Sequence, residues 1–289
     1  FAQAVYTNAY FKQNNIEQND WSDLVDLLAV LNSANGHLPA NYVTDVRQRL
    51  NVDEWMQYMA VNTLLDNDET CLANGVGDDY ALYRGANDTR FLVLPYDNDT
   101  LMGRGLTSVS PHHGLFRMTS VAAMNTFMKT PEFAPVYFEW LHTYATTTFA
   151  ANAMNPFLDQ LFTGYLQQGT IDTMPAFHAN QVNWVLSPIP MTLTVSNNLT
   201  VQSGYPRTTT SSVNLNGTAN AIDTRSVLVN GTPATWSAWQ GTWTASNVPL
   251  TPGINRILVQ SLNTNGVEFS STNVDIWYDD GSVQAESGT

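Results

Sequence analysis

Apolar residues recur at helical spacing through the first two thirds of the chain. One predicted helix follows Asp20, and its apolar face carries four leucines: Leu24, Leu27, Leu28 and Leu31. Asp20 is placed to cap this helix, and Asn35-Gly36 is a typical stop signal. The pattern predicts an amphipathic helix with one face against a core.

A second helix is expected to begin at Asn51, because Glu54 stands three residues later in capping-box position. Apolar side chains then cover most of its surface: Trp55, Met56, Met59, Val61, Leu64 and Leu65. A helix that is apolar on most sides packs inside a core. This helix is expected to end at Asp66, where acidic residues begin to concentrate.

A third helix is expected from Thr130-Pro131-Glu132, since proline is favoured at the first helical position. Aromatic and apolar residues follow it: Phe133, Tyr137, Phe138, Trp140 and Leu141. Their helical periodicity favours core packing over a role in binding.

The pattern changes after Pro188-Ile189-Pro190. Short segments rich in Thr, Val and Leu run from about Met191 to Tyr278, separated by turn pairs: Asn216-Gly217, Asn230-Gly231, Pro252-Gly253 and Asn265-Gly266. About ninety residues with this spacing are typical of an immunoglobulin-like sandwich. Three tryptophans are interpreted as core residues, with a sugar-stacking platform of a carbohydrate-binding module as the alternative: Trp236, Trp239 and Trp243.

The expected fold is therefore multidomain. Residues 1–188 are expected to form a mostly α-helical lobe with a small β-hairpin, residues 189–278 an all-β immunoglobulin-like sandwich, and residues 279–289 a polar tail. The chain begins abruptly at Phe1, as expected of a processed product or part of a longer precursor.

The charge balance excludes some partners. The 289 residues carry 11 Lys+Arg against 25 Asp+Glu, for a net charge of −14. Nucleic acids and anionic membranes require basic patches, so neither is expected as a partner. No run of about 18 apolar residues occurs, so no membrane span is expected. Lysine occurs only at Lys12 and Lys129, while Asn, Thr and Ser are abundant, which is typical of a secreted or cell-surface protein.

Carboxylates concentrate after the second helix in three groups: Asp66, Asp68 and Glu69; then Asp78 and Asp79; then Asp97 and Asp99. Between the last two groups, Tyr80–Tyr83 and Arg90–Leu94 flank turn-forming residues, which predicts a β-hairpin. Its second strand is continuously apolar and is therefore expected to be buried. Because a hairpin returns the chain to its start, Asp97 and Asp99 are expected beside Asp78, Asp79 and the end of the Asn51 helix.

Carboxylates that converge repel one another unless a cation or a proton relieves them. Oxygen ligands favour Mg²⁺ or Ca²⁺ over zinc, and the single cysteine, Cys71, is too little for a thiolate site. The residues alone therefore predict a divalent-cation site, with a structural Ca²⁺ site or acids of a solvated loop as the alternatives. His112-His113, further along, is interpreted as a plain loop rather than a metal site.

Three segments together resemble the CotH (spore-coat protein H) family of atypical kinases: Asp66-Asn67-Asp68, Asp79–Tyr83, and Pro95 through Gly103. The resemblance covers roughly residues 6 to 185 and implies a kinase-like C-terminal lobe that uses ATP and Mg²⁺. It implies catalytic roles for Asp68, Asp79 and Asp97, and metal binding by Asp79, Asp97 and Asp99. Arg84 and Arg104 are the candidates to neutralise the phosphates of the nucleotide.

The chain departs from the family pattern in three ways. Asp79 stands where the family more often has Asn, and Tyr96 where it often has Trp. No glycine-rich loop precedes Asp20, and Lys12 lies in a polar stretch rather than a strand. In the family these parts belong to an N-terminal lobe, so that lobe is expected from another chain or a precursor fragment.

Two functions of different classes follow. The first is part of an exported, CotH-like protein kinase that transfers the γ-phosphoryl group of ATP to hydroxyls of a protein substrate. The alternative is a non-catalytic structural or adhesive protein of a cell-surface assembly, with a degenerate pseudokinase lobe and a structural Ca²⁺ site.

Overall fold

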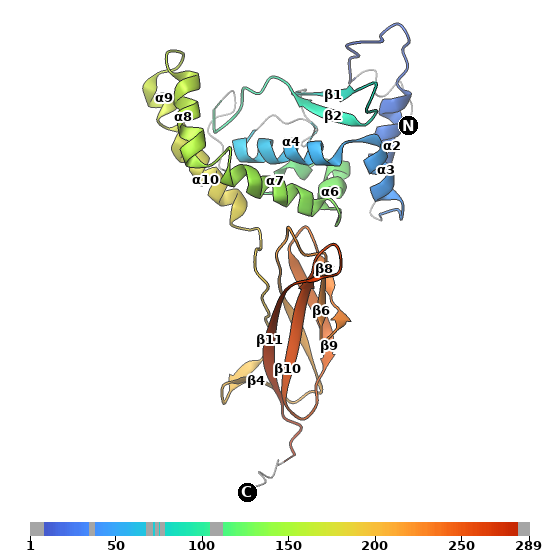
Figure 1. Cartoon of the computed structure of the whole chain (residues 1–289), viewed down its shortest axis with the longest axis vertical. Helices are drawn as coiled ribbons and strands as arrows, with labels where there is room; N and C mark the ends of the chain where they lie inside the picture. The colour runs from blue at the N-terminus through green and yellow to red at the C-terminus, as the bar shows by residue number, and fades with distance from the viewer. Residues whose placement is uncertain are drawn as a thin grey trace. The chain divides into compact units, whose positions relative to one another are not determined.

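The computed structural model describes residues 9–34, 38–67, 72, 75, 79–104 and 112–282. The chain divides into two compact units, Phe1–Pro188 and Ile189–Thr289. The first is mainly helical and the second is built of strands, as Figure 1 shows for each unit by itself. No helix of the described residues is long and apolar enough to cross a bilayer.

The first unit contains the helices α2 (Ser22–Leu31), α3 (Tyr42–Arg49), α4 (Val52–Leu65), α6 (Ala122–Lys129), α7 (Ala134–Thr146), α8 (Ala151–Phe162), α9 (Gln168–Ile171) and α10 (Met174–Leu186). It also contains the 3-10 helix η1 (Arg117–Thr119) and the hairpin strands β1 (Tyr80–Arg84) and β2 (Phe91–Pro95).

The predicted helix after Asp20 is confirmed as α2. Its buried residues are Leu24, Leu27 and Leu31, at the spacing of one helical face. The N-cap position belongs to Trp21, but the carboxylate of Asp20 still accepts a hydrogen bond from the Ser22 N–H at 2.9 Å. The predicted stop signal, Asn35-Gly36, lies outside the described residues.

Helix α4 is the buried centre of this unit, as its apolar pattern predicts. It packs against α7, α10 and β2 (Figure 1), and Trp55 and Met56 are at most 1% exposed. Half of the predicted capping box forms, because the Asn51 side chain accepts from the Glu54 N–H. The Glu54 carboxylate instead accepts from the Val93 N–H at 3.1 Å, which ties the helix to β2. Burial raises the pKa of Glu54 above its usual value.

The predicted helix start at Pro131 is wrong. Residues 131–133 form a turn in which the Thr130 carbonyl accepts from the Phe133 N–H at 2.9 Å, and α7 begins only at Ala134. Pro135 lies in the first turn of α7, where its missing N–H leaves no helical hydrogen bond unmade. Most of the aromatic run is core, as expected, with buried side chains at Phe133, Tyr137, Phe138 and Leu141.

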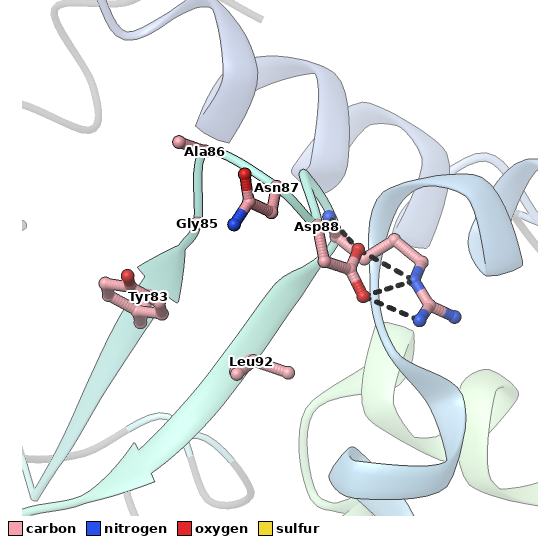
Figure 2. Close-up of a pocket in the computed structure, with 7 residues that line it drawn as sticks. Tyr83, Gly85, Ala86, Asn87, Asp88 and Leu92 are labelled. Atoms are coloured by element: carbon pink, nitrogen blue, oxygen red, sulfur yellow. Dashed lines mark hydrogen bonds and ion pairs between the residues drawn. The ribbon is translucent and has the colours of Figure 1, made fainter.

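The predicted β-hairpin is confirmed. Strands β1 and β2 pair antiparallel from Tyr80 opposite Pro95 to Arg84 opposite Phe91. Asp88 and Arg90 bond to each other where the turn enters β2, at 2.7 to 3.2 Å (Figure 2). The expectation of a fully buried second strand is wrong. Val93 is 1% exposed but Leu94 is 41% exposed, because only one face of a two-stranded sheet packs on α4.

The second unit is a β domain of two sheets. Its strands are β3 (Thr200–Gln202), β4 (Tyr205–Thr208), β5 (Ser212–Thr218), β6 (Ser226–Val229), β7 (Thr232–Pro233), β8 (Thr235–Ser237), β9 (Thr242–Pro249), β10 (Gly253–Leu262) and β11 (Glu268–Tyr278). One sheet has the order β3-β4-β11-β10-β6-β7 and the other β5-β9-β8. The pairing of β4 with β11 is parallel, whereas the other paired strands run antiparallel.

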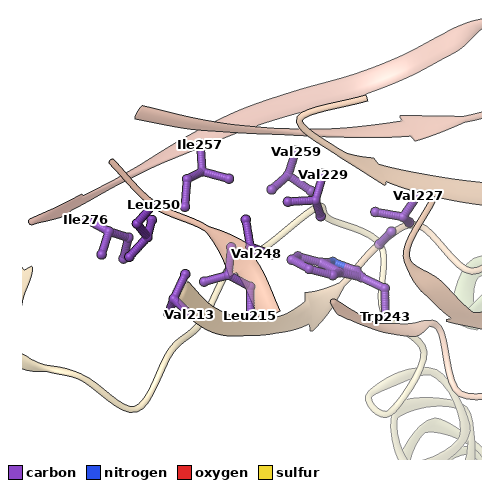
Figure 3. Close-up of a cluster of buried hydrophobic side chains, with 11 residues drawn as sticks. Val213, Leu215, Val227, Val229, Trp243, Val248, Leu250, Ile257, Val259 and Ile276 are labelled. Atoms are coloured by element: carbon purple, nitrogen blue, oxygen red, sulfur yellow. The ribbon is translucent and has the colours of Figure 1, made fainter. Parts of the chain in front are cut away.

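Alternating strand residues fill the space between the two sheets (Figure 3). Trp243 is 1% exposed in this cluster, and Trp236 packs against it. The core interpretation therefore holds for both, and Trp243 offers no ring face for a sugar. The predicted turn at Asn216-Gly217 is wrong, because both residues lie inside β5. A Cβ on Gly217 would lie 1.9 Å from the carbonyl oxygen of Thr194, so this glycine permits a close backbone approach rather than a turn.

His178 on α10 predicts a pH dependence of the stability of the first unit. Its side chain is 2% exposed, Nε2–H donates to the Phe149 carbonyl at 2.7 Å, and Nδ1 has no partner within the described part of the chain. Burial lowers the pKa of this imidazole below its usual 6.5. The unfolded chain therefore binds a proton more readily than the folded one, so the free energy of unfolding is expected to fall as the pH drops below 6.5.

The variant His178→Gln keeps a donor for the Phe149 carbonyl and removes the titration. Urea unfolding of both proteins at about pH 7.5 and about pH 5 measures the effect, and the variant is expected to lose less stability on acidification. Equal losses in the two proteins would contradict the prediction.

Candidate functional site

The end of α4 is closed by polar residues that are themselves buried. Asp66 occupies the C-cap position in the left-handed conformation, with φ 53° and ψ 48°, which aspartate tolerates better than most residues. Asp66 is 3% exposed and Asn67 is fully buried. The Met102 N–H donates to the Leu65 carbonyl at 2.8 Å, so a helix-end carbonyl binds a segment well downstream in the sequence.

The side chain of Asn67 joins α4 to the loop that follows β2. Its Nδ2 donates to Asn62 Oδ1 at 2.8 Å and to Asn98 Oδ1 at 3.1 Å. Its Oδ1 accepts from the hydroxyl of the buried Thr100 at 3.3 Å. A fully buried amide with all these bonds fixes the relative position of the segments that it connects. The loop after β2 therefore lies against the end of α4, as the hairpin argument predicts.

The open end of the hairpin brings Asp79 close to the same loop. The Tyr96 N–H donates to the Asp79 carbonyl at 3.4 Å, extending the β1–β2 ladder by one step. Asp79 is buried, whereas Asp97 and Asp99 are exposed. Asp97 has φ 46°, and its carbonyl accepts from the Asp99 N–H at 3.0 Å, so a tight turn presents both carboxylates.

Asp97 and Asp99 differ from their neighbours in their hydrogen bonding. Asn98 and Thr100 are tied to Asn67. Within the residues that the structure describes, the carboxylates of Asp97 and Asp99 accept no side-chain or backbone hydrogen bond and pair with no cation. A rigid loop thus displays two acids toward solvent while its other polar side chains are engaged.

The donor chemistry fits a hard divalent cation, since it consists of carboxylate and amide oxygens. Among the described residues, however, no three His, Cys, Asp or Glu side chains are grouped closely enough to hold a metal ion. Asp68, the predicted catalytic acid, lies outside the described residues, as do Glu69, Cys71 and Asp78.

The two arginines predicted to neutralise phosphate have protein partners. Arg84 donates to the Thr89 carbonyl at 2.8 Å and lies 3.5 Å from the Asp23 carboxylate. Arg104 donates to the Thr173 hydroxyl, just before α10. Arg84 lies at the turn end of the hairpin, away from the end that carries Asp79. The small pocket of Figure 2 is at that same turn end and is lined by Tyr83, Gly85, Ala86, Asn87, Asp88, Arg90 and Leu92.

The contact between Asp66 and His113 was not expected from the sequence. The Asp66 Oδ1 accepts from the His113 N–H at 3.1 Å and lies 2.8 Å from His113 Nδ1. Arg117, four residues further along at the start of η1, donates to the Asn67 carbonyl at 3.2 Å. The sequence favours a plain loop at His112-His113, because histidines that are neighbours in sequence rarely point at one ion. The sequence does offer one indication of this contact: Asp66 ends a helix that is expected to be buried, and a buried carboxylate needs a hydrogen-bond donor.

A search of curated proteins found none that matches this chain. The family model described as CotH kinase protein matches residues 2–165, which is more than half of the 289 residues. The match includes α4, the hairpin and the loop that carries Asp97 and Asp99, and it ends after α8. The chain therefore belongs to the CotH kinase protein family.

Proposed function

We propose that this chain provides the metal- and substrate-orienting part of a CotH-like protein kinase that uses ATP and Mg²⁺. The observation that carries the proposal is the loop after β2, which the buried Asn67 anchors and which displays Asp97 and Asp99 without partners among the described residues. Acids held in place by a buried network, rather than by ion pairs, remain available to a ligand.

In this proposal each of the four acids has its own role. Asp97 is the principal ligand of the metal, Asp79 and Asp99 are further ligands, and Asp68 orients the acceptor hydroxyl of the protein substrate. When bound, Mg²⁺ neutralises the charge on the phosphate oxygens of ATP. Asp68 follows directly on Asn67, so the same buried amide that anchors the Asp97 loop also holds the chain that enters Asp68.

The parts that grip the nucleotide belong, in this proposal, to an N-terminal lobe on another chain or precursor fragment. Arg84 and Arg104 have protein partners, and either must leave its partner to reach a phosphate. We further propose that the protein acts in a secreted or cell-surface setting, and that the β domain is an immunoglobulin-like module appended to the kinase lobe. Its two-layer order and buried core support that assignment.

Calorimetric titration of the full-length protein, as encoded and together with any N-terminal-lobe chain that co-purifies with it, with ATP in Mg²⁺ tests the function. We expect binding that disappears when EDTA removes the metal. No binding in either condition would contradict the kinase proposal. Stabilisation of the protein by Ca²⁺ without any nucleotide binding would instead support the structural, cell-surface alternative.

A further inference from the structure

The buried carboxylate of Asp66 needs partners, because an ionised group removed from water is unfavourable unless hydrogen bonds replace its hydration. Its side chain is 1% exposed. Oδ1 has two partners, and both are groups of His113. Oδ2 is buried and has no partner within the described residues. His113 therefore contributes both of the hydrogen bonds that the structure describes for this carboxylate.

Two contacts meet at the Nδ1 atom of the His113 ring. Nδ1 lies 2.8 Å from Asp66 Oδ1, to which it donates in the tautomer that carries a hydrogen on Nδ1. Arg117 Nη1 lies 2.8 Å from the same Nδ1, and it also donates to the Asn67 carbonyl. In the other tautomer Nδ1 accepts from Arg117, and the His113 backbone N–H remains the donor to Asp66.

Hydrogen bonds connect three segments of the chain in sequence: the segment at His113, the end of α4 at Asp66 and Asn67, and the loop after β2. His113 and Arg117 hold Asp66 and the backbone of Asn67. The Asn67 side chain holds the loop that presents Asp97 and Asp99 through Asn98 and Thr100. A displacement of the segment at His113 is therefore transmitted to Asn67 and from there to the loop that displays the acids.

We propose that Asp66 and His113 are positioning residues: their contact holds the end of α4, and through Asn67 the Asp97 loop, in the arrangement that phosphoryl transfer requires. This inference rests on the proposed kinase function. Reacting groups must be aligned to within about 1 Å for efficient transfer, and a misplacement of that size lowers a rate by about 100-fold. Neither residue is required to touch the nucleotide, so its affinity is expected to be preserved.

The test measures ADP release by the full-length protein with ATP and Mg²⁺, giving kcat and KM separately. The variant His113→Ala is expected to lower kcat by about 10- to 100-fold and to change KM by less than about 2-fold. In His113→Asn the side-chain amide can place an N–H near the position of Nδ1 and is expected to restore most of kcat.

The matched control is His112→Ala. His112 is adjacent and also makes a side-chain bond, from Nδ1 to Gln181 Oε1 at 2.9 Å, but it does not contact Asp66. Its kcat is expected to stay within about 2-fold of the parent. Asp66→Asn serves as a second variant if His113→Ala fails to fold, because it preserves the volume but replaces the charged acceptor by a neutral amide oxygen, which weakens both bonds from His113. It is expected to lower kcat with KM unchanged.

The outcomes separate the two proposals. If the parent protein neither binds nor turns over ATP, the kinase function fails and the positioning role fails with it. If the parent is active and His113→Ala matches it, the positioning role alone is overturned. Equal losses in His112→Ala and His113→Ala also overturn it, because activity would then follow general destabilisation of the segment.

Discussion

Asp97→Asn is expected to lower Mg²⁺-dependent turnover of ATP by the full-length protein by about 100-fold or more, the largest loss among the variants considered. The substitution removes a charge that is proposed to hold the metal, and asparagine tolerates the positive φ of 46° at this position. Asp97 is exposed and has no partner within the described residues, so the melting temperature is expected to change by little. ADP release and differential scanning calorimetry measure the two quantities.

Asp88→Asn is the matched control for this variant. It makes the same change of charge in the same hairpin, at the turn end, where Asp88 pairs with Arg90. An exposed ion pair contributes little to stability, and turnover is expected to stay within about 2-fold of the parent. Unchanged turnover in Asp97→Asn would exclude Asp97 as the principal metal ligand. An equal loss in Asp88→Asn would assign the effect to overall charge instead.

Trp55→Ala is expected to lower the free energy of unfolding of the helical unit by about 3–5 kcal/mol. Trp55 is 1% exposed, its ring meets Phe127 edge to face at a centroid distance of 5.9 Å, and its Nε1–H donates to the Phe91 carbonyl at 3.0 Å. The variant loses buried apolar area, leaves a cavity and removes the donor that satisfies Phe91. Urea unfolding monitored at the helical far-ultraviolet signal measures the loss.

Trp184→Ala is the control for that variant. Trp184 lies on α10 and is 56% exposed, so its removal is expected to change stability by less than about 0.5 kcal/mol. Among the described residues, the buried cluster around Trp243 contains only residues of the β domain, so the unfolding of that cluster is followed as a separate signal. A loss below about 1 kcal/mol in Trp55→Ala would contradict the central role assigned to α4.

Much of the helical unit could be predicted because its signals are local. The apolar surface of α4, the leucine face of α2 and the two strands flanking Gly85 each lie within a few turns or one hairpin of sequence. Local signals also explain the errors. Pro131 and Pro135 both satisfy the rule for a helix start, and only the turn at Thr130 decides between them. Asn216-Gly217 matches the pattern of a hairpin turn. In the structure Gly217 lies inside a strand, where the absence of a side chain lets the backbone of Thr194 approach closely.

The candidate site was predictable only in part. The predicted hairpin places the Asp97 loop beside the end of α4, because antiparallel pairing returns a chain to its start. The role of Asn67 as the anchor, and the contact between Asp66 and His113, depend on pairs that are 31 to 47 residues apart with no periodic pattern between them. Such contacts arise from tertiary packing, which a single sequence does not reveal.

The anchoring of this site through Asn67 has a consequence for the order of events during synthesis. Asn67 can meet its partner Asn98 only after 31 further residues have been added, and Asp66 can meet His113 only after 47. Closing loops of that length is entropically unfavourable until both ends are packed. Helix α4 can therefore form early on the ribosome, before the hydrogen-bond partners of Asp66 and Asn67 have been synthesised. A nascent chain arrested before His113 should contain α4 without a stable arrangement of the acids, so the site forms after the helix that carries it rather than together with it.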